Sequence, residues 1–152
     1  MNAPVDLIEL FPVISAAFEM GKTVKLHASG YSMSPLLKSG RDVIILSRCE
    51  NPNKLKKYDV PLYFRDEKTL VLHRIVRVHS DCFDMCGDGE SEIEKGISKD
   101  KIAAIAIGFI KNGKIIDTRN ILYKIYSIIW CSIIPWRKYV FALYSKIIGK
   151  KK

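Results

Sequence analysis

One residue whose side chain could act as a nucleophile is Ser32, in the stretch from Ala28 to Leu46, ASGYSMSPLLKSGRDVIIL. Small and turn-forming residues surround Ser32. Pro35, three positions later, keeps the residue before it out of the helical region, so the chain must turn just after the hydroxyl. The run from Asp42 to Leu46 then predicts a β-strand. A hydroxyl in a loop held between rigid elements is a candidate nucleophile, and the alternative is an ordinary loop serine.

A histidine further along the chain could supply the matching base. The alternating stretch from Thr69 to His79, TLVLHRIVRVH, predicts one continuous strand, with His73 among β-branched neighbours on one face. A histidine titrates near pH 6.5, so its neutral form can accept a proton from a hydroxyl at physiological pH. The alternative is a purely structural histidine. His27 alternates with apolar residues in the strand predicted from Thr23 to Ala28 and is expected to face solvent.

Four short motifs, in this order along the chain, resemble the boxes of one peptidase superfamily. Ser32-Met33-Ser34-Pro35, with the Gly40 and Asp42 that follow, resembles the serine box of type I signal peptidases and LexA-like autoproteases. Lys57-Tyr58-Asp59-Val60 resembles their K-x-G-D-x-V box, with Tyr58 where the glycine usually stands. The strand LVLHRIVRV looks like the base-bearing strand of the signal peptidase branch that uses histidine, and Gly87-Asp88-Gly89 resembles the final Gly-Asp-Asn box. The resemblance covers roughly residues 12 to 117.

This resemblance implies a catalytic site. Ser32 would be the nucleophile, His73 the base, and the backbone N–H groups of Ser32 and Met33 the oxyanion hole. A carboxylate bonded to the far imidazole nitrogen would fix the histidine tautomer. Asp88 matches the box by position and Glu94 lies nearer to the family's downstream acid, so both are candidates. The alternative for each acid is a solvated hairpin loop.

The elements around these residues predict the fold. Apolar residues at helical spacing predict a helix from Val5 to Met20. Short strands are predicted at residues 56–64, 101–110 and 114–117, the last two joined by an Asn112-Gly113 turn. We therefore expect a mainly β, compact and partly barrel-like domain of the signal peptidase type over residues 1–117, with an N-terminal helix and C-terminal amphipathic helices.

Residues 118–152 form a basic, apolar tail. From residue 111 onward there are ten Lys/Arg and one acid, whereas residues 1–110 hold 15 of each, so the net charge of +9 belongs to this end. The longest charge-free run, Ile125 to Trp136, is shorter than the roughly 20 residues needed to span a bilayer. Two short amphipathic helices rich in aromatic and basic residues are expected to bind an anionic membrane surface through residues 119–152, and no nucleic acid is expected. The alternative is that they pack on the protein's own sheet or on a partner.

The four cysteines do not form a disulfide framework. Cys82 and Cys86 lie in a predicted strand, about 13 Å apart and beyond bridging distance, so free thiols are expected. His79, Cys82 and Cys86 lack a fourth ligand and the usual spacing for zinc, so we expect neither a metal nor a cofactor. The N-terminal helix carries acids and lacks the pattern of a secretion signal or membrane anchor, which favours a cytoplasmic or peripheral membrane location.

The sequence therefore favours a serine endopeptidase that resembles signal peptidase and cleaves a peptide or precursor protein by a Ser-His mechanism. Two alternatives stay open. One is an autoproteolytic or regulatory module of the LexA-like type, whose usual base is a lysine. The other is a non-catalytic module that binds a membrane surface.

Overall fold

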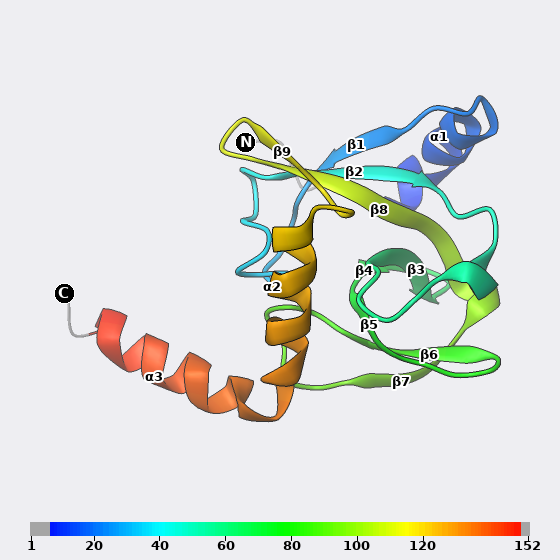
Figure 1. Cartoon of the computed structure of the whole chain (residues 1–152). Coiled ribbons are helices and arrows are strands. Elements are labelled where there is room, and N and C mark those ends of the chain that lie inside the picture. Colours follow the sequence, from blue (N-terminus) through cyan, green and yellow to red (C-terminus); the bar gives the residue numbers. More distant parts are fainter. Residues whose placement is uncertain (1–6, 150–152) are drawn as a thin grey trace.

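The computed structural model describes the backbone of residues 7–149 and the side chains of residues 8–143. Two antiparallel sheets make up the body of the molecule (Figure 1). The larger, curled sheet has the order β1-β2-β8-β3-β4, with β9 also pairing with β8. Its strands are β1 (Val24–His27), β2 (Val43–Arg48), β3 (Pro61–Asp66), β4 (Thr69–Leu72), β8 (Ile102–Lys111) and β9 (Lys114–Asp117). The smaller sheet contains β5 (Arg74–Val78), β6 (Cys82–Cys86) and β7 (Glu94–Ser98).

Helices lie at both ends of this body. The α-helices are α1 (Leu7–Glu19), α2 (Ile121–Ser132) and α3 (Arg137–Gly149), and short 3-10 turns are η1 (Pro52–Lys54), η2 (Lys99–Lys101) and η3 (Ile134–Trp136). The expected mainly β, half-barrel domain with an N-terminal helix and C-terminal helices is therefore confirmed. The first residues of the predicted N-terminal helix, Val5 and Asp6, lie outside the described part of the chain.

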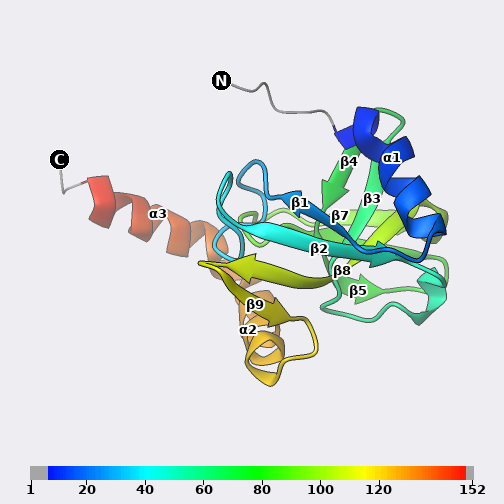
Figure 2. The ribbon, with the colours of Figure 1, turned by 90° about the horizontal axis from the view of Figure 1, so that it is seen from above.

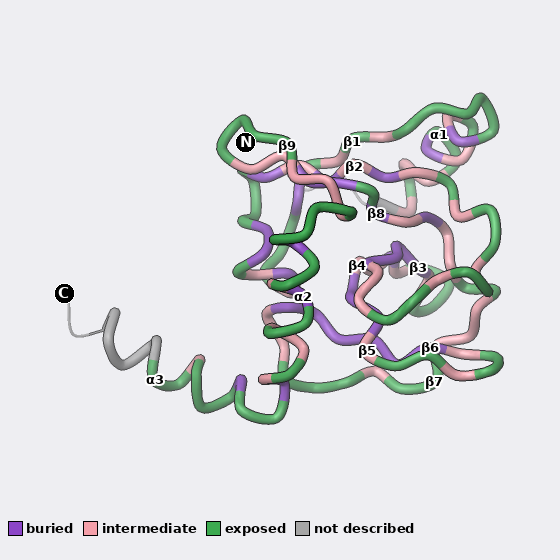
Figure 3. Tube along the Cα trace, viewed as in Figure 1, coloured by how far each residue is buried: buried purple, intermediate pink, exposed green. Residues whose placement is uncertain are grey.

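The main core fills the inside of the curled sheet. Its buried residues come from α1, from the loop that carries Ser32 and from alternate positions of the strands (Figure 3). Phe11 of α1 contacts the ring of Phe64 edge-on at a centroid distance of 4.9 Å, and Phe18 is buried beside it in the same core. Helix α1 therefore closes one side of the sheet because its apolar residues recur at helical spacing.

Residues with left-handed backbone conformations mark two tight turns. Asn112 and Gly113, at φ values of 50° and 75°, join β8 to β9, as the sequence predicts. Tyr58 has a φ of 82°, a conformation that costs a residue with a Cβ atom and that glycine adopts freely. Tyr58 therefore holds a left-handed conformation at this turn despite its Cβ atom.

The prediction of a single strand from Thr69 to His79 is wrong, because the structure divides this stretch into two strands. The chain leaves the large sheet after Leu72 and enters the small sheet at Arg74, so His73 lies at the corner between β4 and β5. Simple alternation cannot show this break, because apolar residues continue on both sides of it. The break places His73 where the two sheets meet, and its side chain is only 1% exposed.

The C-terminal helices differ in how they meet the body. Helix α2 lies against the sheets, whereas α3 extends away from them (Figures 1 and 2). Asn120 caps α2 by accepting the Leu122 N–H, and Tyr123 and Ser127 are buried on its inner face. The sequence-based alternative, that the tail packs on the protein's own sheet, therefore describes α2. None of the described helices is both long enough and apolar enough to cross a membrane.

Candidate active site

The loop that carries Ser32 connects β1 to β2 and is held by its own backbone. At its base Ala28 N–H donates to Asp42 O at 2.8 Å, and Gly40 N–H donates to Ala28 O at 2.8 Å. Met33, Leu36 and Leu37 point into the core and anchor the loop from beneath. The Ser34-Pro35 peptide bond is cis. Ser32 itself is half-buried, because its neighbours Met33, Leu36 and Leu37 are the residues that pack into the core.

Asp42 fixes the end of this loop. Its carboxylate is fully buried, accepts the Lys38 N–H at 2.9 Å and forms two hydrogen bonds with the Arg41 guanidinium. The hydrogen bond from Arg41 holds the pKa of Asp42 below its ordinary value. Arg41 therefore gives this buried acid a counter-charge.

The Gly87-Asp88-Gly89 segment packs directly against the serine loop. Gly89 N–H donates to Ser32 O at 2.7 Å. A Cβ atom on Gly87 would lie 2.4 Å from Ser32 O, and one on Gly89 would lie 2.4 Å from Tyr31 O. Only glycine allows two backbone segments to approach this closely. The two glycines therefore position the loop that carries Ser32.

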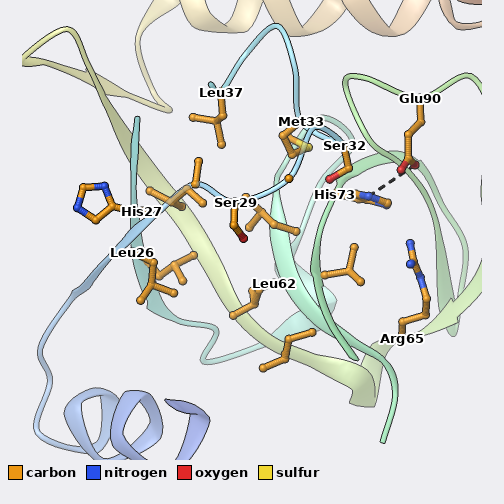
Figure 4. Close-up of a pocket in the computed structure, with 17 residues that line it drawn as sticks. Leu26, His27, Ser29, Ser32, Met33, Leu37, Leu62, Arg65, His73 and Glu90 are labelled. Carbon is orange, nitrogen blue, oxygen red and sulfur yellow. Dashed lines mark ion pairs between the residues drawn. The ribbon is translucent and has the colours of Figure 1, made fainter. Parts of the chain in front are cut away.

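Ser32 and His73 line the same cavity, which has a volume of about 190 Å³. Figure 4 shows the Ser32 hydroxyl and the His73 imidazole both reaching into it. The His73 Nε2 atom is buried and has no hydrogen-bond partner among the described residues. In many enzymes the hydrogen bond between a catalytic hydroxyl and its base is long in the free state and shortens when substrate binds. Nε2 is therefore available to a hydroxyl in the cavity.

The opposite nitrogen of His73 faces an acid. His73 Nδ1 lies 3.1 Å from Glu94 Oε1 and 3.3 Å from the Tyr63 hydroxyl. Arg65 holds Glu94 in turn, with its Nε donating to Oε2 at 3.0 Å and its Nη2 to Oε1. Carboxylate, imidazole and cavity thus follow one another in the order that orients a catalytic histidine.

The electrostatics of the site keep His73 neutral. Burial lowers the pKa of His73, because the charged imidazolium would lose its hydration, while Glu90 and Glu94 oppose this shift in part. Burial also raises the pKa of Glu94, but the hydrogen bond and the charge of Arg65 outweigh it, so that pKa lies below its ordinary value. A neutral imidazole beside an ionised carboxylate is the pair that general base catalysis requires.

Asp88, the other candidate acid, is bound elsewhere. Both of its carboxylate oxygens accept hydrogen bonds from Arg74, at 2.8 and 2.7 Å, and both side chains are fully buried. The Tyr126 hydroxyl also donates to Asp88, and the Trp130 indole donates to its carbonyl. Asp88 therefore ties the loop before Glu90 to the small sheet and to α2. Of the two acids, only Glu94 forms an ion pair with His73 in the described structure.

The backbone N–H groups of Ser32 and Met33 remain free. Ser34 N–H donates to Tyr31 O at 3.0 Å, so Ser32 and Met33 are the two central residues of a turn that begins at Tyr31. The first N–H groups of such a turn have no acceptor within it. Neither of these two groups makes a hydrogen bond within the described part of the chain, and both can receive an oxyanion.

Three residues around His73 were not singled out in the sequence. Tyr63 falls in the strand predicted at residues 56–64, and Arg65 and Glu90 belong to none of the motifs. The Arg65–Glu94 pair joins positions 29 apart in the chain, which no local pattern reveals. Glu90 Oε2 lies 3.6 Å from His73 Nε2 (dashed line in Figure 4). Only a residue's place in the folded chain could identify these neighbours.

Glu90 and Glu94, together with His73, are residues of the types that bind metal ions. Ligand atoms of His73, Glu90 and Glu94 lie within 4.8 Å of one another. Arg65 already binds both oxygens of Glu94, so a cation would have to displace a guanidinium. The other candidate ligand, His79, is instead 3.1 Å from Asp84 and closes the turn between β5 and β6. All four cysteines are free.

Comparisons with models of known protein families and with curated proteins find no match to this chain.

Proposed function

We propose that this protein is a serine endopeptidase in which Ser32 is the nucleophile and His73 the general base. One observation carries the proposal. The imidazole of His73 faces Glu94 through Nδ1, while its buried Nε2 is unpartnered in a cavity that the Ser32 hydroxyl also lines. A buried polar atom without a partner costs free energy, and such atoms are typical of sites that bind a reactant.

The arrangement supports acyl transfer in two steps. Ser32 Oγ attacks the peptide carbonyl while His73 Nε2 takes the hydroxyl proton, and the N–H groups of Ser32 and Met33 stabilise the oxyanion. The imidazolium, stabilised by Glu94, then returns the proton to the leaving amine and an acyl-enzyme forms. Water, deprotonated by His73, hydrolyses the ester and releases the acid product and Ser32.

The cavity walls point to an apolar group beside the scissile bond. Most of the lining is aliphatic, and at the floor Leu62 and Leu46 are buried. Figure 4 shows Leu26 and Leu62 on the side of the cavity away from Glu90. We propose that one apolar side chain of a peptide or precursor protein enters here, since such a chain gains by leaving water and a charged one loses.

The nature of the base separates this proposal from the LexA-like alternative. No lysine lines the cavity among the described residues. Lys111 lies close to the serine loop, but its Nζ donates to Pro35 O at 3.5 Å, and it is not among the residues that line the cavity. These positions support the histidine branch of the signal peptidase-like enzymes, which the four sequence motifs resemble.

The nucleophile is tested by replacing Ser32 with alanine. We expect Ser32→Ala to fold normally and to lower cleavage of an equimolar decapeptide library, read by mass spectrometry, by at least about 10³-fold. Ser34→Ala, two positions away in the same loop, is the matched control and should cleave at a near wild-type rate. Wild-type cleavage by a folded Ser32→Ala protein would remove Ser32 from the mechanism.

A second proposal concerns where the enzyme works. We infer that residues 119–152 bind the protein to an anionic membrane surface. Helices α2 and α3 leave large apolar side chains exposed, and residues 118–152 contain eight Lys/Arg and no acid. The exposed apolar residues are Ile121, Leu122, Ile125, Ile128, Ile129, Trp136, Tyr139, Val140 and Leu143. This combination of apolar and basic side chains is typical of helices that lie in a membrane interface. Some of the lysines in this count lie beyond the described side chains.

A further inference from the structure

A second hollow adjoins the cavity of Ser32 and His73. This groove has a volume of about 680 Å³ and lies between α3 and the loop from β6 to β7. Arg65 and Glu90 line both hollows, so the groove and the cavity meet at these two side chains. A peptide chain that passes the nucleophile can therefore continue into the groove.

The charge of the groove is negative. Its lining holds three carboxylates, Glu90, Glu92 and Glu94, and one guanidinium, Arg65. Arg65 is bound to Glu94, so these two charges offset each other. Within the described residues, Glu92 has no ion pair, and Glu90 pairs only with His73, which is uncharged in its buried state. Two carboxylates thus face the groove without a cation.

We propose that this groove binds a basic side chain of the substrate and that Glu90 is the residue that selects it. The inference rests on the proposed peptidase function. Glu90 and Glu92 supply the charge, while Ile93 and Phe141 supply apolar walls for the methylene stem of a lysine or arginine. An aromatic ring also attracts a cation placed over its face. The substrate class is therefore a peptide with a basic residue a short distance from an apolar residue at the scissile bond.

The backbone around Glu90 is fixed in advance. Glu90 N–H donates to Gly87 O at 3.1 Å, and the buried Arg137 donates through Nη1 to Glu90 O at 2.9 Å and to Gly87 O at 2.7 Å. Only the side chain of Glu90 is left to move. A selecting group on a rigid backbone loses little entropy when it binds its ligand.

The position of Glu90 also links recognition to catalysis. Its Oε2 atom is 3.6 Å from His73 Nε2, the unpartnered and buried atom that must take the proton from Ser32. A substrate cation would pair with Glu90 and draw the carboxylate away from this nitrogen. A basic substrate therefore changes kcat as well as KM, because Glu90 also acts on the pKa of His73, which distinguishes Glu90 from a remote surface charge.

The test is the cleavage of an equimolar decapeptide library, with mass-spectrometric identification of the cut bonds. We expect Lys and Arg to be enriched about fivefold over Gln at one position on a fixed side of the bond, the upper range for an exposed ion pair. Glu90→Gln should lower this enrichment to about twofold or less, and Glu90→Lys should favour Asp and Glu instead. Glu67→Gln, an exposed acid in the turn between β3 and β4, should leave it unchanged. Cleavage with no basic preference, or with a preference that survives Glu90→Gln, overturns the inference while the peptidase function stands.

A binding experiment tests the groove independently of peptide cleavage. The Ser32→Ala protein is titrated with two fluorescein-labelled decapeptides that differ only in one central Lys or Glu. We expect about fivefold tighter binding of the Lys peptide and loss of this difference in Ser32→Ala/Glu90→Gln. This result, combined with a wild-type protein that cleaves no peptide, would support the groove and reject the proposed function. Equal binding of the two peptides would reject the groove.

Discussion

At the residue scale, His73 is the centre of the proposed chemistry because its two nitrogens meet different surroundings. Nδ1 faces Glu94 and Tyr63, whereas Nε2 faces the cavity and the carboxylate of Glu90. Since burial outweighs both acids, the imidazole stays neutral over the pH range in which an unburied histidine would begin to protonate. This environment makes the pH dependence of the proposed activity informative.

We expect the rate to fall on the acid side of a transition at or below about pH 6.5 and to stay level through pH 8. His73→Gln, which cannot accept a proton, should lower kcat/KM by at least about 10²-fold. His79→Gln, at the turn between β5 and β6 and outside the cavity, is the control and should change little. An activity that rises only above pH 9 would instead indicate a lysine base.

The depressed pKa of His73 also predicts how stability changes with pH. Between the folded pKa and about 6.5, the unfolded chain binds a proton that the folded protein does not. The contribution of His73 to stability is therefore complete above about pH 6.5 and decreases as the pH falls below it. Urea midpoints of wild-type and His73→Gln protein, compared from pH 8 to pH 5, measure this contribution. The wild-type midpoint should fall more steeply than that of the variant, and parallel curves would contradict the prediction.

A matched pair of substitutions separates the two acids. Asp88→Asn removes the carboxylate that pairs with the buried Arg74 and should lower the free energy of unfolding by about 3–5 kcal/mol. Glu94→Gln breaks a partly exposed pair with Arg65, which contributes only about 0–1 kcal/mol. It should nevertheless lower kcat by at least about 10²-fold, because His73 loses its ionised partner. Urea unfolding and single-turnover cleavage measure the two effects, and the reverse pattern would return Asp88 to the catalytic role.

Sequence reasoning reached only part of this site. Ser32 and His73 lie within short motifs and line one cavity, and Glu94, a candidate from the acidic segment downstream, pairs with His73. The assignments of Arg65 and Glu90 depend on pairings across the sheets, which a single sequence does not encode locally. For Asp88, motif position alone could not reveal that Arg74 lies opposite, because that arginine was placed in the middle of a continuous strand.

At the scale of elements, the corner at His73 and the packing of α2 organise the molecule. The strands predicted at residues 23–28, 42–46, 56–64, 101–110 and 114–117 overlap β1, β2, β3, β8 and β9, because apolar patterns and the Asn112-Gly113 turn mark them in the sequence. Alternation could not show where the chain passes from β4 to β5, because apolar residues lie on both sides of the break. Composition likewise marked α2 as apolar without showing that Tyr123 and Ser127 hydrogen-bond the buried Arg74.

Two truncations test the role of α2. Deleting residues 140–152 leaves Arg137 and α2 in place, so the β-domain should keep its urea midpoint. Deleting residues 121–152 removes the Arg74 contacts of Tyr123 and Ser127 and the Arg137 contacts with the loop before Glu90. We expect the longer deletion to lower stability by several kcal/mol, because it leaves buried polar groups unsatisfied. Equal midpoints for the two proteins would show that the body folds independently of α2.

At the scale of the whole molecule, charge and apolar surface are concentrated at one end. Residues 1–110 sum to zero charge, and the excess of basic residues lies with α2, α3 and the segments beside them. The acids Glu90 and Glu92 line the same groove as Phe141 of α3. A membrane bound by this end would therefore lie near the mouth of the groove, which would favour substrates that are themselves held at the membrane surface.

We expect the protein to sediment with vesicles that contain anionic phospholipid and to bind weakly to purely zwitterionic ones. Each Lys or Arg near the surface adds about 1 kcal/mol at moderate ionic strength, and salt at about 1 M shortens the screening length to about 3 Å. Binding should therefore decrease strongly with added salt. The double variant Trp136→Asp/Leu143→Asp places acids at two exposed apolar positions and should bind less, whereas Ile115→Asp, an exposed apolar residue of β9, should bind normally. Vesicle binding that does not depend on lipid charge or salt, or that is unchanged in the Trp136→Asp/Leu143→Asp variant, would contradict the prediction and indicate that this end of the molecule binds a protein partner instead.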